Sequence, residues 1–415
     1  RARAPACLLE GVTAAADAEG LAAVDIAIEG GRVASVLAAA AEADRAPGID
    51  LRNGQVWPCF VDLHTHLDKG HIWPRSPNAG GSFEGAIAAV RLDRDRHVRW
   101  TGADLHRRIE FGLRSAYAHG TAAIRTHIDT KGAQAATAWE VLSDLRETWR
   151  GRIELQAASI EGIESLVDET LLAETVRLLR KHGGILGTVT RLQPGLVEAL
   201  DRIFHVAMDQ GLDLDFHVDE TADPAARSLR AIAEAALRYR FPRRIVAGHC
   251  CSLACQSEAE ARRTIELVAE AGIAVVSLPM CNMYLQDRAS GRTPRWRGVT
   301  DVHALRAAGV QVAIASDNTR DPFYPWGDLD GLEVFRAGVR ILHLDHPFGD
   351  WPAAITRTPA DVMGLGELGR IGPGAPANLI LFRGRCFSEL LSRPEHDRVV
   401  LRAGRPIDTT LPDYS

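Results

Sequence analysis

The 415-residue sequence lacks any apolar run approaching the roughly 20 residues that a membrane-spanning helix needs. Its formal net charge of −6 is small for this length, and no block of basic residues offers a surface to nucleic acid. Lysine is scarce, with only three residues, although arginine is common. We therefore expect neither a membrane nor a nucleic acid as a partner.

Cysteine is too sparse and too irregularly spaced for a disulfide framework. The count of seven is odd, and only Cys250, Cys251 and Cys255 cluster, in "GHCCSLAC". This spacing lacks the paired C-x2-C form of a zinc site, so buried thiols in a reducing compartment are expected. The opening "RARAPACLLEG" has no apolar core of a signal peptide, and we expect a cytoplasmic protein.

No glycine-rich phosphate loop follows an early strand, as a doubly wound open sheet would favour. Instead, short apolar segments alternate with amphipathic helical segments, and eight such strands are the count of an α/β fold of the (β/α)8 barrel type. The strands are expected at residues 56–64, 122–129, 153–160, 184–191, 212–219, 244–249, 273–279 and 310–317. In the helical segment 164–184, a buried stripe is predicted at Leu166, Leu171, Val176 and Leu179.

The two ends of the chain differ from its middle. Residues 1–57 contain "AVDIAIEGGRVASV", the pattern of a hairpin with a Gly-Gly turn, and short β runs return after residue 374. We expect residues 1–57 and 374–415 to form a small flanking β-sandwich. Residues 58–373 are expected to form the barrel.

Polar side chains gather where the predicted strands end, which is where a barrel of this type builds its active site. The set comprises His64, His66, Asp68, His127, Asp129, His217, Asp219, Glu220, His249, Asp317 and Asn318. A lone His at a strand end is usually a packing residue, and a lone Asp is often a helix cap. Four of the eight strands end with His, however, and this recurrence favours a metal site.

Three imidazoles and one carboxylate suit a single divalent ion, Zn²⁺ or Fe²⁺. These donors are His64, His66, His217 and Asp317. Such an ion lowers the pKa of a water molecule to roughly 7. Asp317 is suited to take a proton from that water, Glu220 to carry it to a ring nitrogen of a substrate, and His249 to orient the water.

These motifs, in this order, resemble the amidohydrolase superfamily and specifically its cytosine-deaminase-like branch. The resemblance covers most of the chain, through "FVDLHTHLD", "RTHID", "FHVDE", the "GH" at 248–249, "NMYLQDR", "TPRWRGVT" and "SDNTRDPFYPWG". It implies a (β/α)8 barrel, a flanking β-sandwich and one catalytic metal. The residues that it assigns are the ligands His64, His66, His217 and Asp317, the proton shuttle Glu220, and His249 facing the nucleophilic water. Strand four, "GILGTVTR", has no lysine to bridge a second metal, so a mononuclear site is expected.

Two departures from this branch argue against cytosine as the substrate. Ile160 stands where the branch has a glutamine that grips the base, and Asn318 stands where it has a second Asp. Isoleucine cannot hydrogen-bond, and asparagine donates as well as accepts. Aromatic residues near "DPFYPWG" suit a flat ring. Lys69 either meets the substrate or is a surface lysine or a partner for Asp68. The expected substrate-binding residues are Ile160, Asn318, Phe323, Trp326, Lys69 and Leu285.

The sequence therefore predicts a metal-dependent hydrolytic deaminase of a small amino-substituted N-heterocycle, other than cytosine, that releases ammonia. The small heterocyclic substrate is the expected partner, and a homo-oligomer is possible. A second hypothesis is hydrolysis of a substituted amine, or of a cyclic amide C–N bond, on a related ring. A hypothesis of another class is a barrel that binds a ligand without catalysis.

Overall fold

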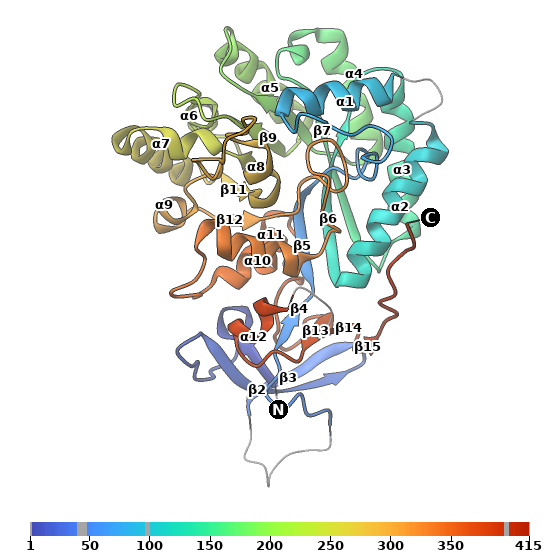
Figure 1. Cartoon of the computed structure of the whole chain (residues 1–415), viewed down its shortest axis with the longest axis vertical. Helices are drawn as coiled ribbons and strands as arrows, with labels where there is room; N and C mark the ends of the chain where they lie inside the picture. Colours follow the sequence, from blue (N-terminus) through green and yellow to red (C-terminus); the bar gives the residue numbers. More distant parts are fainter. Residues whose placement is uncertain (1, 40–47, 96–99, 394–397, 415) are drawn as a thin grey trace.

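The computed structural model describes residues 2–39, 48–95, 100–393 and 398–414. Eight parallel strands form the upper part of the molecule in Figure 1. They are β5 (Phe60–Thr65), β6 (Thr121–Asp129), β7 (Glu154–Ile160), β8 (Leu186–Thr190), β9 (Leu214–Val218), β10 (Ile245–His249), β11 (Ala274–Ser277) and β12 (Val312–Ile314). Their order and number confirm the predicted (β/α)8 barrel.

The barrel strands pair as a three-stranded sheet, β5-β6-β7, and a five-stranded sheet, β8 to β12 in chain order. Isolated bridges join the two sheets on both sides. Ala158 pairs with Ile185 between β7 and β8, and Thr65 pairs with Asp317 between β5 and the residues after β12. The ends of distant strands are thereby brought to one face of the barrel.

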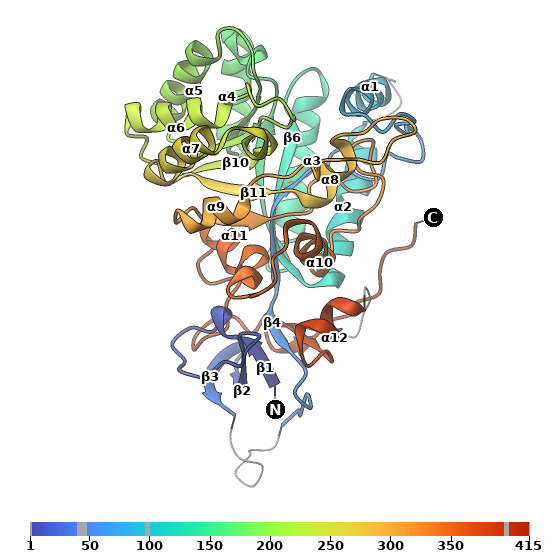
Figure 2. The same ribbon diagram turned by 60° about the vertical axis from the view of Figure 1, so that its left-hand side comes forward.

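Helices surround the strands, as the turned view in Figure 2 shows. Those that follow barrel strands or cover the barrel are α1 (Phe83–Arg94), α2 (Gly102–His119), α3 (Gln134–Thr148), α4 (Glu169–His182), α5 (Leu196–Gln210), α6 (Ser228–Tyr239), α7 (Glu258–Glu270), α8 (Pro279–Leu285), α9 (Val302–Ala307), α10 (Gly331–Leu342) and α11 (Arg357–Val362). Short α12 (Phe387–Ser392) lies with the chain ends. No helix in the described ranges is both long enough and apolar enough to span a membrane.

Local sequence signals set the ends of helix α4. The Asp168 side chain accepts hydrogen bonds from the first-turn amides, and the helix closes at Gly183 in the left-handed conformation, with φ of 65°. The predicted buried stripe is only partly correct, because Leu166 and Leu179 are buried whereas Leu171 and Val176 are half-buried. The side chains that α4 buries are Leu172, Thr175, Leu178, Leu179 and His182.

Both chain ends build two small sheets below the barrel. One is β1 (Ala2–Pro5), β2 (Leu21–Glu29) and β3 (Arg32–Ala38); the other is β4 (Val56–Pro58), β13 (Leu379–Phe382), β14 (Arg398–Arg402) and β15 (Arg405–Pro406). The predicted Gly-Gly turn joins β2 to β3, with φ of 57° at Gly30 and 82° at Gly31. The flanking β-sandwich from both ends is therefore confirmed.

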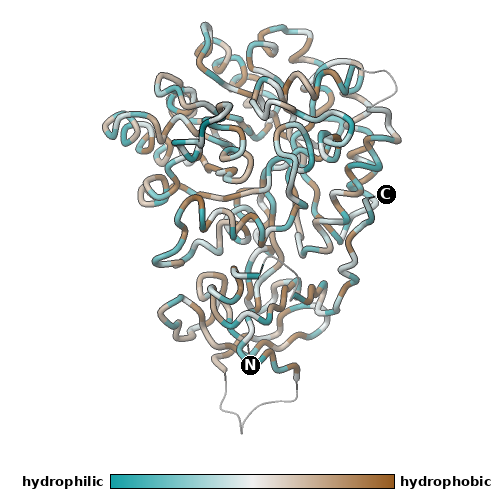
Figure 3. The backbone as a smooth tube through the Cα atoms, viewed as in Figure 1, coloured by the Kyte–Doolittle hydropathy of each residue, from teal (hydrophilic) through white to brown (hydrophobic). Residues whose placement is uncertain are grey.

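The predicted strand at 56–64 is two strands in the structure. β4 pairs with β13 in the sandwich, and after Cys59 the chain enters β5 of the barrel. The single apolar run at 56–64 does not reveal that its two halves pair with strands of different sheets. Trp57 packs edge-on against the rings of Phe60 and Phe335, so the core is continuous between the two parts. In Figure 3, brown hydrophobic stretches run along the inner strands.

Candidate active site

Three histidine side chains from two strands converge inside the barrel. His64 lies on β5, His66 directly follows it, and His217 lies on β9; all three are buried. The Nε2 atoms of His64 and His217 are 3.0 Å apart, and those of His217 and His66 are 3.2 Å apart. Burial lowers the pKa of each imidazole well below its usual value. The rings are therefore neutral, and their nitrogen lone pairs are available to a cation.

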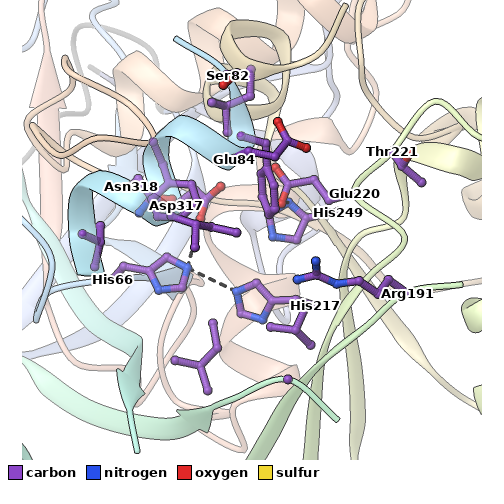
Figure 4. Close-up of a pocket in the computed structure, with 18 of the residues that line it drawn as sticks. His66, Ser82, Glu84, Arg191, His217, Glu220, Thr221, His249, Asp317 and Asn318 are labelled. Atoms are coloured by element: carbon purple, nitrogen blue, oxygen red, sulfur yellow. Dashed lines mark hydrogen bonds and ion pairs between the residues drawn. The ribbon is translucent and has the colours of Figure 1, made fainter. Parts of the chain in front are cut away.

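Asp317 completes this donor cluster from the opposite side (Figure 4). Its Oδ1 lies 3.3 Å from Nε2 of His66 and 3.7 Å from Nε2 of His64. Its backbone is left-handed, with φ of 64°, and its amide donates to the carbonyl of His64 at 2.9 Å. Left-handed non-glycine residues cluster at functional sites, where the surroundings hold them in place.

The Asp317 carboxylate lacks a compensating partner. Both oxygens are buried, and neither has a hydrogen-bond partner in the part of the chain that the structure describes. Burial raises its pKa to about 8, despite the nearby thiol of Cys281. A buried carboxylate facing three neutral imidazoles fits a divalent cation, because such an ion supplies the missing charge.

Glu220 and His249 lie beside this cluster and are joined by a residue that sequence analysis did not select. Nδ2 of Asn282, on α8, donates to Oε1 of Glu220 at 2.9 Å and lies 3.0 Å from Nδ1 of His249. Burial, followed by the charge of Asp317, raises the pKa of Glu220 well above its usual value. A carboxyl group that readily holds a proton is suited to acid–base catalysis.

A cavity of about 980 Å³ opens onto these groups. His66, His217, Glu220, His249 and Asp317 all line it. Helix α1 and the residue before it form another wall, which Figure 4 shows through Ser82 and Glu84 above the site. Nothing in the sequence of α1 distinguished it from an ordinary surface helix.

Five of the six predicted substrate-binding residues line the cavity: Ile160, Asn318, Phe323, Lys69 and Leu285. Trp326 does not belong to the lining. Its side chain is 60% exposed and packs against the rings of Tyr284 and Tyr324. The aromatic pattern around "DPFYPWG" therefore mixes a cavity residue with a surface cluster, which spacing alone could not separate.

Lys69 is buried at the cavity wall and is ion-paired. Its Nζ lies 2.6 Å from Oδ1 of Asp129 and 3.5 Å from Oδ1 of Asp68. Burial works against the ammonium ion, but the two carboxylates outweigh it and the pKa of Lys69 is raised. Lys69 is thus a fixed positive charge at the cavity wall; its position agrees with a substrate contact and with a partner for Asp68, but not with a surface lysine.

His127 and Arg191 are two further residues of the site that the predicted ligand, catalytic and substrate-binding residues did not include. The His127 ring centroid lies 4.1 Å from that of His64, and its Nε2 lies 3.1 Å from Oδ1 of Asp215. One donor atom from each of His64, His66, His127 and His217 falls in a group spanning 4.8 Å. Arg191 lines the cavity near His217, as Figure 4 shows. His127 had a strand-end signal, whereas Arg191 had none.

Gly248 leaves the space that the His64 ring occupies. A Cβ atom at this position would lie 2.9 Å from Cε1 of His64. We expect Gly248→Ala to displace the ring and to weaken metal binding by about tenfold, since overpacking a core costs about 1–3 kcal/mol. Metal titration of the variant measures this effect. Gly366→Ala is the control, because its Cβ would meet no atom within 4 Å. Equal metal affinity in both variants would contradict the expectation.

Comparison with known proteins agrees with this geometry. Residues 105–408 match the model of the amidohydrolase family. The chain is 52% identical over 413 residues to a pterin deaminase of Rhizobium rhizogenes, covering 100% of this chain and 94% of that protein.

Solved structures of similar fold cover almost the whole chain. The structure of 5-methylcytosine deaminase from Klebsiella pneumoniae with 5-fluorocytosine superimposes with a TM-score of 0.83 at 24% identity, over 100% of this chain and 98% of that one. The structure of N-isopropylammelide isopropylaminohydrolase from Burkholderia multivorans gives 0.74 at 26% identity, over 98% and 97%. These structures share the fold, and the family match together with the 52% identical relative shows that this chain belongs to the amidohydrolase family, as its motifs predicted.

Proposed function

We propose that this amidohydrolase is a hydrolytic deaminase that removes the exocyclic amino group of a pterin. Its reaction class, hydrolysis of a C–N bond with deamination of a heterocycle, agrees with the sequence prediction. The substrate rests on one observation above all: the relative that is 52% identical over the full chain is a pterin deaminase. The cavity of about 980 Å³ supports it, because this volume leaves space for a second ring beside the reacting one.

We propose His64, His66, His217 and Asp317 as the ligands of one divalent ion, Zn²⁺ or Fe²⁺. Their convergence, their burial and the unpartnered carboxylate support this set. When bound, the ion supplies a water molecule that ionises near neutral pH. We place this chemistry in residues 58–373 and assign residues 1–57 and 374–415 to an accessory sandwich.

Three residues of the site then transfer protons or hold the nucleophilic water in place. Asp317 accepts the proton of the nucleophilic water, and Glu220 delivers a proton to the ring nitrogen beside the amino-bearing carbon. The water oxygen forms a bond to that carbon, the C–N bond to the amino group breaks, and ammonia leaves with the transferred protons. His249 is suited to hold the water, since its Nε2 is buried without a partner among the described residues.

The cavity wall offers several groups to the substrate. Ile160, Leu285 and Phe323 provide apolar surface for a flat bicyclic ring. Asn318 also lines the cavity; its Nδ2 donates to Oδ2 of Asp321 at 2.6 Å, and its Oδ1 accepts from the thiol of Cys281 at 3.6 Å. Lys69 provides a fixed cation for a ring carbonyl. We propose that these contacts replace those of a single-ring deaminase.

Incubation of the metal-replete protein with pterin tests the proposal. We expect stoichiometric release of ammonia and a product in which oxygen replaces the amino group, read by an ammonia assay and by mass spectrometry. Ring opening would add water without releasing ammonia, and hydrolysis of a substituted amine would release an alkylamine from an N-alkylated ring. Absence of ammonia from pterin and from a panel of aminopyrimidines, aminotriazines, aminopurines and cyclic guanidines would refute the deaminase.

A further inference from the structure

Helix α8 presents one amide nitrogen to both acid–base residues of the site. Asn282 is fully buried, and its Nδ2 lies 2.9 Å from Oε1 of Glu220 and 3.0 Å from Nδ1 of His249. Glu220 Oε2 and His249 Nδ1 are themselves 3.7 Å apart. The two catalytic groups therefore meet at a single NH₂ group, which has one hydrogen for each of them.

The chemistry of an amide fixes the orientation of this contact. An NH₂ group only donates, so both atoms that face it must accept. Turned over, the amide would direct its oxygen at Oε1 of Glu220, and two acceptors would then repel in the ionised state that a proton shuttle must pass through. Because Nδ1 of His249 accepts from this NH₂ group, it carries no proton, and the ring proton lies on Nε2.

The surroundings hold α8 in place for this contact. One turn after Asn282, Nε2 of Gln286 donates to the backbone oxygen of Glu220 at 3.2 Å. Gly298 packs so closely on the helix that a Cβ there would lie 2.3 Å from Cβ of Gln286 and 3.0 Å from the backbone oxygen of Asn282. The Asn282 amide is consequently fixed relative to the end of β9.

We propose that Asn282 is a positioning residue that sets the Nε2–H tautomer of His249 and orients the Glu220 carboxylate through one amide nitrogen. The catalytic part of this inference rests on the proposed function. With Nε2 protonated, His249 presents a donor to the nucleophilic water. With Oε1 held, Glu220 keeps Oε2 for proton transfer to the substrate.

The first test determines the tautomer of His249 and does not depend on enzymatic turnover. The zinc-loaded protein is labelled with ¹⁵N-histidine, and long-range ¹H–¹⁵N spectra are recorded with His249→Gln to assign the ring. We expect the Nε2–H form of His249 in the parent protein and loss of this preference in Asn282→Asp, which keeps the side-chain shape but removes the donor. An Nδ1–H form in the parent, or an unchanged form in the variant, would overturn the proposal. Because a parent protein inactive toward pterin would refute only the proposed function, the two failures are distinguishable.

The second test is a double-mutant cycle on turnover of pterin. We expect Asn282→Leu to lower kcat by about 100-fold with KM within about threefold and with zinc retained. In a His249→Gln background, the same change should cost less, about tenfold or below, because only the contact of Asn282 with Glu220 is then left to lose. Met283→Ala on the exposed side of α8 is the control. Equal losses in both backgrounds, or loss of zinc with loss of kcat, would assign Asn282 a structural role and overturn the proposal.

Discussion

Asp317→Ala is expected to lose both the bound metal and the turnover of pterin. Oδ1 of Asp317 is the oxygen donor of the cluster, 3.3 Å and 3.7 Å from the Nε2 atoms of His66 and His64. Loss of a metal that stabilises the transition state by several kcal/mol corresponds to a decrease in kcat/KM of about 1000-fold or more. Metal analysis and an ammonia assay on the same sample measure both effects. Full metal retention in the variant would refute the ligand assignment.

The conservative change Asp317→Asn separates the metal from the fold. In the metal-free protein, the carboxylate is buried without a hydrogen-bond partner among the described residues, and such a group destabilises the folded state. We therefore expect metal-free Asp317→Asn to have a higher Tm than the metal-free parent, although it binds metal poorly. A lower Tm would show that the carboxylate is stabilised in some other way.

Asp321→Asn is the matched contrast, because Asp321 is a buried carboxylate four residues away with its partners in place. Its Oδ1 accepts from the amides of Phe323 and Tyr324 at 2.8 Å and 3.1 Å, and its Oδ2 accepts from Asn318 at 2.6 Å. An amide at this position would turn its NH₂ group toward that of Asn318. We expect the Tm of Asp321→Asn to be lower than that of the parent, whereas the Tm of Asp317→Asn is expected to be higher.

The strand-end rule explains why much of this site could be predicted from sequence. The alternation of strands and helices predicts the barrel, and a barrel brings the ends of its strands to one face. His64, His217 and Asp317 therefore meet although they lie far apart in the chain. The same reasoning could not divide the run at 56–64 into β4 and β5, since both halves are apolar and their difference lies only in the strands they pair with.

Residues outside the strand ends had no comparable signal. Asn282 lies on a seven-residue helix after β11 and begins the motif "NMYLQDR", but an uncharged amide after a strand without a charged end was not marked as a site residue. Arg191 follows β8 as one arginine among many. Both acquire a role only through contacts made by the folded chain. Trp326 shows the reverse, because an aromatic residue in a matching motif lies on the surface.

Glu220→Gln should abolish turnover while leaving the metal and the substrate bound. Glutamine can still accept the hydrogen bond that Asn282 donates to Oε1, which is 2.9 Å long in the parent protein. It cannot, however, take up and deliver a proton. General acid–base catalysis contributes about 10²- to 10⁴-fold, and we expect kcat to fall within or beyond this range with little change in the Kd of pterin. Single-turnover assays, metal analysis and equilibrium binding measure the three quantities.

The control is Glu333→Gln. Burial also raises the pKa of Glu333, but this residue lies on α10 and outside the lining of the cavity. We expect its kcat to equal that of the parent, so a loss confined to Glu220→Gln reports proton transfer rather than a general response to losing a buried acid. A barrel that only binds its ligand predicts no turnover in any of the three proteins. Unchanged turnover in Glu220→Gln would instead assign the proton transfer to another group. Asp317 is then the first candidate, because it is the acidic side chain whose charge raises the pKa of Glu220.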